Sequence, residues 1–197
     1  MRHRPTLIIM VKEPRPGRVK TRLAAGIGTI PATWWFRHTV HGLLRRLDRD
    51  PRWKTVLSVA PNPAVVARCW PAQIPRIPQG AGDLGARMLR ALAANGPGPR
   101  VLIGGDIPDV RPAHIARAFR ALGTAELVFG PAGDGGFWLV GARNDLALNA
   151  GFMENIRWSH AETLNDTVKS ATGRIAFVDT LDDVDTAADI ARVGAPP

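Results

Sequence analysis

Short apolar runs alternate with segments of helical period along the whole chain, and this alternation constrains the fold more than any other feature. Thr6–Val11, Thr55–Ala60 and Val101–Ile103 are apolar and rich in β-branched residues, as buried strands are. Pro31–Leu47 carries an apolar stripe of helical spacing, and Asp83 can cap a helix that runs to about Ala94. This order predicts an α/β fold with a mostly parallel, mixed sheet.

The rest of the chain continues the same pattern. Ile74–Pro78 is extended but holds two prolines, which suits an edge strand or a loop. The further expected elements are a short helix at Asn62–Trp70, a helix at Pro112–Leu122, strands at Glu126–Gly130 and Phe137–Gly141 around the loop Pro131–Gly136, a helix opened by a capping box at Ser159–Glu162 and running to about Ser170, a strand at Ile175–Val178, and a terminal helix capped by Asp185. No linker or repeat interrupts the pattern, so residues 1–197 are expected to form a single domain.

Composition narrows the class of protein. Apolar residues make up 45 % and charged residues 22 % of the chain, which is ordinary for a globular domain. The apolar run Leu7–Val11 is too short for a membrane span. A single cysteine, Cys69, excludes an intramolecular disulfide and a multi-cysteine metal site. We therefore expect a soluble, cytoplasmic protein without a membrane partner.

The positive charge is concentrated near the N-terminus. The formal net charge is +9, and residues 1–54 hold 13 basic against 3 acidic side chains. Such a region attracts nucleic acid, anionic membranes or phosphorylated small molecules. Arginine-rich codon usage is the alternative explanation, because 22 of the 26 basic residues are Arg. Nucleic acid is the less favoured partner, since no recognised nucleic-acid motif is present and the tryptophans are not interleaved with the cations.

A basic segment follows directly after the first expected strand. Its prolines and Gly17 disfavour regular structure, so its backbone amides are free to face a ligand. Its five cations suit the oxygens of a polyphosphate, and they are Lys12, Arg15, Arg18, Lys20 and Arg22. The segment is not a Walker A loop, and a solvated basic turn is the alternative.

Two carboxylates stand in glycine-rich loops beyond strands. Asp106 follows Gly104-Gly105 at the end of a buried strand, where a carboxylate can hold Mg²⁺ or Mn²⁺ against phosphate oxygens. Asp134 is flanked by glycines, and taken by itself it is explained as well by an Asp-Gly hairpin turn as by a functional role. Beside Asp106 and the basic segment, Asp134 becomes a candidate second metal ligand or catalytic carboxylate. Ligands of parallel sheets bind at this carboxyl edge.

Other catalytic motifs are absent or weak. The stretch Gly80–Gly85 matches G-x-G-x-x-G, but the strand before it is poor and Asp83 would place a negative charge beside a pyrophosphate. The histidines lack H-E-x-x-H spacing, and no G-x-S-x-G occurs, which argues against a zinc hydrolase and a serine hydrolase.

Four ordered motifs together carry a family resemblance. They are KEPRPGRVKTRL, PQGAGDLGARM, IGGDIPD and GPAGDGGFWLVG, and the likeness runs from about Leu7 to Ile190, through Trp158-Ser159 and Asp183-Val-Asp185-Thr. The chain resembles bacterial transferases of the GT-A fold, a group also known as radical-SAM or selenodomain-associated transferases and related to molybdenum-cofactor and phospholactate guanylyltransferases. This chain departs from the family pattern at two positions. Gly105 stands where Ser or Thr is common, and Phe137 stands where Tyr is common.

The resemblance implies a Rossmann-like three-layer sandwich of the nucleoside-diphosphate-sugar transferase type. It also implies an enzyme that uses a nucleotide (an NTP or a nucleotide sugar), a divalent metal and a small acceptor, and it leaves nucleotidyl and glycosyl transfer open. By motif, the nucleotide phosphates are expected to bind to Arg18, Lys20 and Arg22, and the base or the ribose is expected to contact Asp83. The full set of expected nucleotide-binding residues is Lys12, Arg15, Gly17, Arg18, Lys20, Arg22, Asp83 and Arg87. Asp106 and Asp134 are the expected metal ligands, and Lys20 and Asp134 the expected catalytic residues. The alternative is a non-enzymatic binder of nucleotide or nucleic acid.

Overall fold

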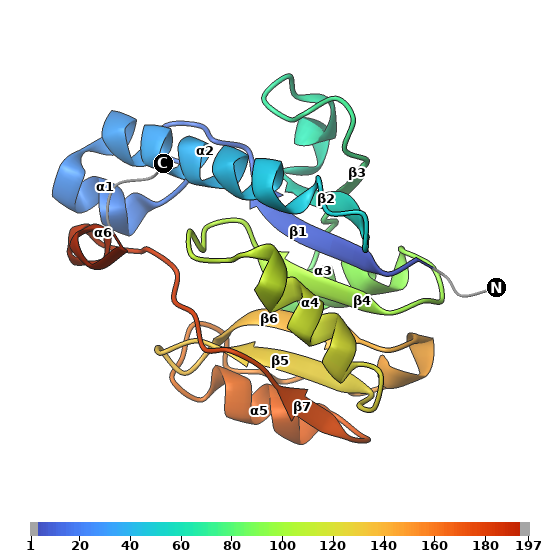
Figure 1. Cartoon of the computed structure of the whole chain (residues 1–197). Coiled ribbons are helices and arrows are strands. Elements are labelled where there is room, and N and C mark those ends of the chain that lie inside the picture. Colours follow the sequence, from blue (N-terminus) through green and yellow to red (C-terminus); the bar gives the residue numbers. More distant parts are fainter. Residues whose placement is uncertain (1–3, 194–197) are drawn as a thin grey trace.

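The structure is a computed structural model, and it describes residues 4–193 as one seven-stranded sheet covered by helices on both faces (Figure 1). The strands are β1 (Thr6–Lys12), β2 (Lys54–Ala60), β3 (Arg76–Pro78), β4 (Arg100–Gly104), β5 (Leu127–Pro131), β6 (Phe137–Ala142) and β7 (Ile175–Phe177). The α-helices are α1 (Thr21–Ile27), α2 (Thr29–Leu47), α3 (Leu84–Ala93), α4 (Pro112–Ala121), α5 (Thr163–Ser170) and α6 (Ala187–Val193). Short 3₁₀ helices cover Asn62–Val66 and Asp145–Ala147.

The sheet is mixed and mostly parallel, as the sequence predicts. Its order is β3-β2-β1-β4-β6-β5-β7, and β1 pairs in parallel with both β2 and β4. Of these seven strands, β6 alone runs antiparallel to its neighbours, because it follows β5 through a tight loop. β3 is an edge strand, as its prolines indicate. The carboxyl ends of β1, β4 and β5 therefore lie at one edge of the sheet.

Two hydrophobic cores give the fold its three layers. On one face, Leu7, Ile9 and Val11 of β1 pack with side chains of α2 and α4. On the other face, Ile8 of β1 packs with side chains of α3, including Met88. Successive β1 residues thus enter opposite cores, which is the alternation that a strand buried on both faces requires.

The segment after β7 crosses back over the carboxyl edge of the sheet. Residues 178–186 run from β7 to α6, and α6 contacts α1 (Figure 1). Val184 anchors this crossing, because its side chain is fully buried. We call residues 178–186 the C-terminal crossing, and it brings acidic side chains of the last part of the chain to the first loop.

Several expected helix boundaries are wrong. The loop after β1 ends in the unexpected helix α1, and α2 begins at Thr29. The helix expected at Asn62–Trp70 ends at Val66. Ser159–Glu162 forms no capping box, because Ser159 has a φ of 57° and α5 starts only at Thr163. Asp185 does not cap α6; the Asp189 carboxylate accepts the N–H groups of Asp185 and Thr186 instead.

No helix in the described part of the chain is both long and apolar enough to cross a bilayer.

Candidate active site

Three cavities lie at the carboxyl edge of the sheet, and the main one adjoins each of the other two. The main cavity has a volume of about 730 Å³ and is lined by the loops after β1 and β4, by the start of α3 and by β6. A basic recess of about 500 Å³ shares Lys12, Arg18 and Arg87 with it. A smaller cavity of about 220 Å³ shares Asp106 and Phe137 with it.

The main cavity gathers most of the expected site residues. It is lined by Lys12, Gly17, Arg18, Lys20, Arg22, Arg87 and Asp106. Arg15 lines only the basic recess, where its Nε lies 2.6 Å from Glu13 Oε2. Asp134 lines the smaller cavity, together with Asp106. Asp83 lines none of the three cavities.

Asp83 has the structural role that the sequence indicates. It is the N-cap of α3, and its Oδ1 accepts the Ala86 N–H at 2.8 Å, which satisfies one of the free amides at the helix start. The expected contact between Asp83 and a nucleotide stays a prediction.

Lys20 is the centre of an ion-pair cluster. Its Nζ lies 2.8 Å from Asp106 Oδ2, 2.7 Å from Asp185 Oδ1 and 3.5 Å from Asp183 Oδ2, and its side chain is only 6 % exposed. The residue is in the left-handed region, with a φ of 47°. A non-glycine residue held there is strained, and such strain concentrates at functional sites. Arg22 adds a further contact, at 3.3 Å, to Asp185 Oδ2.

The cluster shifts the protonation of its members in different directions. Burial opposes the charge of Lys20, but Asp106, Asp185 and Asp183 outweigh it and raise the pKa of the ammonium above its ordinary value. Burial raises the pKa of Asp183 to about 6, with Lys20 opposing this shift and the Asp106 and Asp185 carboxylates adding to it. Burial also acts to raise the pKa of Asp185, but the hydrogen bond and charge of Lys20 prevail and lower it. Lys20 therefore stays cationic at neutral pH.

Two glycines let Asp106 take its place. A Cβ on Gly104 would lie 2.9 Å from Asp106 Oδ1, and one on Gly105 would lie 2.9 Å from Val11 Cγ1. Larger residues would push the loop away from β1, so the absence of side chains allows the close approach that the sequence indicates. Asp106 thus lies between the main and the smaller cavity.

Asp134 lies at the tip of the β5–β6 loop. Its Oδ1 accepts the Gly136 N–H at 2.9 Å, and the Gly133 N–H donates to Asp182 Oδ1 of the C-terminal crossing at 2.7 Å. Gly135 has a φ of 86°, and its carbonyl accepts the Leu164 N–H of α5 at 2.9 Å. The loop is therefore held between α5 and the C-terminal crossing.

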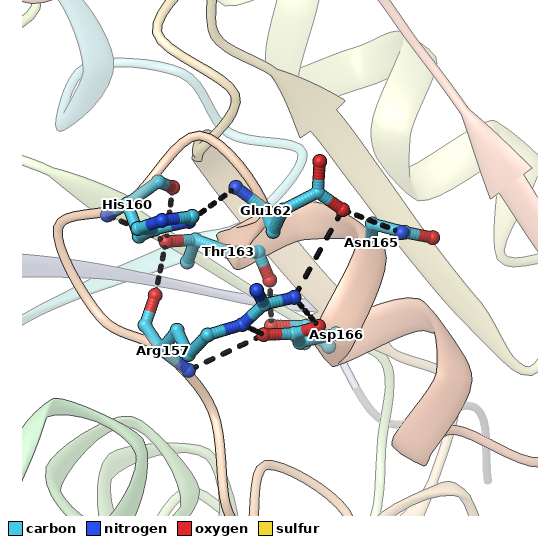
Figure 2. A network of polar contacts seen from close by, with 7 residues as sticks. Arg157, His160, Glu162, Thr163, Asn165 and Asp166 are labelled. Carbon is cyan, nitrogen blue, oxygen red and sulfur yellow. Dashed lines mark hydrogen bonds and ion pairs between the residues drawn. The ribbon is translucent and has the colours of Figure 1, made fainter.

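A polar network holds residues 157–166 in place, and Figure 2 shows its contacts. Arg157 grips Asp166 of α5 through two contacts of 2.7 Å, from Nε to Oδ2 and from Nη2 to Oδ1. The Thr163 hydroxyl lies 2.7 Å from both the Arg157 and the His160 carbonyl oxygens. These contacts bracket Trp158 and Ser159, both of which line the smaller cavity.

The network is expected to be sensitive to strong acid only. The hydrogen bonds from Arg157 lower the pKa of Asp166 to about 2 from its ordinary 3.8. Because folding lowers this pKa, the contribution of the Arg157–Asp166 pair to the stability of the folded state is complete above pH 3.8 and is lost as the pH falls toward 2. We predict that the Arg157 Nε–H signal in NMR spectra keeps its position down to about pH 4 and shifts below it. In Asp166→Asn this acid transition should vanish; a wild-type transition near pH 6 would contradict the assignment.

Sequence reasoning missed three residues of this site. Gln79 is buried at the end of β3, where its Nε2 donates to the carbonyls of Val11 and Ser58, and it lines the main cavity. The other two are Asp183 and Asp185. The D-V-D-T motif contains both, but only the C-terminal crossing shows that these aspartates reach Lys20. Trp158 lines the smaller cavity, as its place beside Ser159–Glu162 in the sequence suggests.

A divalent metal was expected at Asp106 and Asp134. In residues 4–190, no three His, Cys, Asp or Glu side chains are arranged to hold a metal by themselves. Mg²⁺ in nucleotide-using enzymes is commonly held by one or two carboxylates together with substrate phosphates. The site offers such oxygen donors beside cations that suit phosphate, so its residues fit a metal that arrives with its nucleotide.

Comparison with known proteins places the chain in a family. Residues 43–160, more than half of the chain, match the family described as an uncharacterized protein conserved in bacteria (DUF2064). The chain belongs to this family. Among proteins with curated descriptions, none matches significantly.

Solved structures support the fold class. A protein from Desulfovibrio desulfuricans G20, provisionally named a nucleotide-diphospho-sugar transferase, is 31 % identical, with a TM-score of 0.85 over 94 % of this chain and 84 % of that one. Rv0371c from Mycobacterium tuberculosis H37Rv, solved in complex with manganese, is 18 % identical, with a TM-score of 0.57 over 98 % of both chains. The 4-diphosphocytidyl-2C-methyl-D-erythritol synthase from Anaerococcus prevotii DSM 20548 is 10 % identical, with a TM-score of 0.60 over 95 % of both chains.

These likenesses bear out the expected architecture. The chain has the α/β fold of nucleotide-diphospho-sugar transferases, with its mostly parallel mixed sheet.

Proposed function

We propose that this protein is a metal-dependent transferase that takes its donor group from a nucleotide, either an NTP or a nucleotide sugar. The observation that carries the proposal is the main cavity, where the cations of the first loop face Asp106 across the carboxyl edge of the sheet. A polyphosphate needs cations, and a metal that bridges it to the protein needs a carboxylate. The named activities of the structural neighbours agree with this chemistry.

The cations divide into two groups by their partners. Within residues 4–190, Lys12, Arg18 and Arg87 make no ion pair, and all three line both the main cavity and the basic recess. Lys20 and Arg22 are instead paired with Asp185. The first group is therefore ready to receive phosphate oxygens. Lys20 would act from its fixed place beside Asp106, where its positive charge stabilises negative charge on the leaving group.

Asp106 would hold Mg²⁺ or Mn²⁺ together with the phosphates of the nucleotide. Rv0371c, a protein of the same fold, has been solved with manganese, which supports Mn²⁺ as one candidate. The bound metal would supply Lewis-acid stabilisation of the leaving phosphate oxygens. The protein orients the nucleotide through the first loop and keeps Asp106 in place through the close approach at Gly104 and Gly105.

A panel of nucleotides tests the proposal directly. The melting temperature is measured with NTPs and nucleotide sugars, each with and without Mg²⁺ or Mn²⁺. A ligand present at about 100 times its Kd should add about 2.7 kcal/mol to the free energy of unfolding. A metal-independent shift by nucleic acid, with steep salt dependence, would favour the alternative of a non-enzymatic binder. If no nucleotide raises the melting temperature with either metal, the proposal is wrong.

Arg18 and Arg87 should carry much of the phosphate affinity. Replacement of either by Ala removes charge-assisted hydrogen bonds that are worth about 1.5–3 kcal/mol each, so nucleotide affinity should fall about tenfold to hundredfold. Titration calorimetry with the best nucleotide of the panel measures this loss. Arg45→Ala is the matched control, because Arg45 is an exposed arginine of α2 that lines none of the three cavities. Equal affinity in all three variants would rule out the first loop and α3 as the phosphate site.

A further inference from the structure

The smaller cavity differs in chemistry from the nucleotide region beside it. It adjoins the main cavity through Asp106 and Phe137, and it extends toward the β5–β6 loop and the start of α5. A molecule in the smaller cavity would therefore approach a nucleotide in the main cavity from the side of Asp106. In a transferase this is the position of the acceptor, and we call it the acceptor cavity.

The charges of the acceptor cavity are unfavourable to an anion. Asp106, Asp134 and Asp183 contribute to its lining, and no Lys, Arg or His is among the described residues that line it. The metal proposed at Asp106 would offset the charge of that carboxylate, and the charges of Asp134 and Asp183 would remain. Lys20 is not among these lining residues, and its ammonium is already shared by Asp106, Asp183 and Asp185. The main cavity and the basic recess, by contrast, hold the arginines and lysines of the first loop. A phosphate would therefore bind in the nucleotide region rather than here.

The walls of the acceptor cavity are aromatic. Phe137, Trp138 and Trp158 line it, and the Phe137 and Trp158 rings meet edge to face with centroids 6.4 Å apart. Trp158 approaches α3 closely, because a Cβ on Gly85 would lie 2.7 Å from its Cζ2. The Arg157–Asp166 pair holds the same segment in place (Figure 2). Fixed ring surfaces beside carboxylate acceptors suit a molecule with apolar C–H faces and hydroxyl groups.

We propose that the acceptor is an uncharged, hydroxylated molecule of the sugar or polyol class, and that the group transferred to it is a glycosyl group. This inference rests on the proposed function. A hydroxyl oxygen of the acceptor attacks the anomeric carbon of a nucleotide sugar and forms the new C–O bond. The bond from that carbon to the diphosphate breaks, and the nucleoside diphosphate leaves with the electron pair. The hydroxyl proton passes to the Asp134 carboxylate, whose Oδ1 is oriented by the Gly136 N–H.

Nucleotidyl transfer, the competing reaction, would require a positively charged acceptor cavity. In nucleotidyl transfer to a phosphorylated acceptor, the cavity has to receive a dianion, which requires cations that its lining lacks. The charge of the acceptor therefore separates the two reactions.

Matched pairs of probes test the proposal. The protein is first saturated with the nucleotide that binds best and with Mg²⁺, which is diamagnetic, so that the main cavity and the basic recess are occupied. Glucose, galactose and mannose are then compared with their 6-phosphates by saturation-transfer NMR titration. We expect at least one free sugar to bind, with a Kd at least about tenfold lower than that of its phosphate ester.

Two variants and a control locate the binding. Ala132→Lys places a cation in the acceptor cavity, since Ala132 lines it, and should reverse the preference toward the phosphate ester. Ala94→Lys adds the same charge on an exposed residue after α3, outside the three cavities, and should leave the preference unchanged. Asp134→Asn should keep nucleotide affinity but slow transfer to a bound sugar by about 10²–10⁴-fold.

The outcomes separate this inference from the function on which it rests. If nucleotide binds but the 6-phosphates bind as well as the free sugars or better, the acceptor is anionic and the inference is wrong. If nucleotide binds and no sugar of either kind does, the inference is wrong as well. If no nucleotide binds at all, the proposed function itself fails, and the acceptor assignment fails with it.

Discussion

Asp106→Asn should fold normally and lose nearly all metal-dependent nucleotide affinity. Asn keeps the shape of the side chain and one oxygen near Lys20 Nζ, which lies 2.8 Å from Asp106 Oδ2 in the wild type. It removes the negative charge that a divalent cation requires. We expect the nucleotide Kd measured with Mg²⁺ or Mn²⁺ to rise about hundredfold, which corresponds to about 2.7 kcal/mol, and the Kd without metal to change little.

Asp109→Asn is the control for this experiment. Asp109 is an exposed carboxylate in the same loop, and it lines none of the three cavities. Its replacement should leave the nucleotide Kd within about threefold of the wild-type value, because surface substitutions usually change free energies by no more than about ±0.5 kcal/mol. Unchanged affinity of Asp106→Asn in saturating metal would show that the metal, if needed, binds elsewhere.

Gly135→Ala should disrupt the β5–β6 loop and the start of α5 together. Gly135 has a φ of 86°, and an added Cβ would overlap the backbone carbonyl of Ala161. Because that carbonyl belongs to the main chain, the overlap can be relieved only if the loop and the segment before α5 separate. We expect a loss of more than about 3 kcal/mol in the free energy of unfolding, measured by denaturant titration. Sugar binding in the acceptor cavity should be lost as well.

Gly151→Ala isolates the contribution of the clash. Gly151 has a φ of 89°, close to that of Gly135, but an added Cβ would meet nothing within 4 Å. It therefore measures the backbone strain alone, which costs about 1–2 kcal/mol. Equal destabilisation of the two variants would mean that the loop and Ala161 are not packed against each other as the structure shows.

The elements that sequence pattern predicted well are those with long or strongly apolar stretches. The buried strands at β1, β2 and β4 and the helices α2, α3 and α4 lie close to their expected positions. α1 was missed because it spans only seven residues and buries Leu23 alone, so no periodic stripe is visible. The capping box at Ser159 failed for a different reason. Contacts with the β5–β6 loop and the Arg157–Asp166 pair hold that segment in another conformation.

For the site, the sequence alone determined the candidate cations of the first loop, the glycine-flanked Asp106 and Asp134, and the edge of the sheet where they meet. These follow from local patterns, because a strand end, a glycine pair and a cluster of charges can each be read within a few residues. Only the tertiary structure decided which of these cations are held in ion pairs, as Lys20 and Arg22 are. Lys20 and Asp185 are 165 positions apart, and a contact over that distance depends on how the C-terminal crossing packs. The division into a basic main cavity with its recess and a smaller cavity with no cation among its described lining residues has the same origin, since the lining of the smaller cavity comes from five separate stretches of the chain.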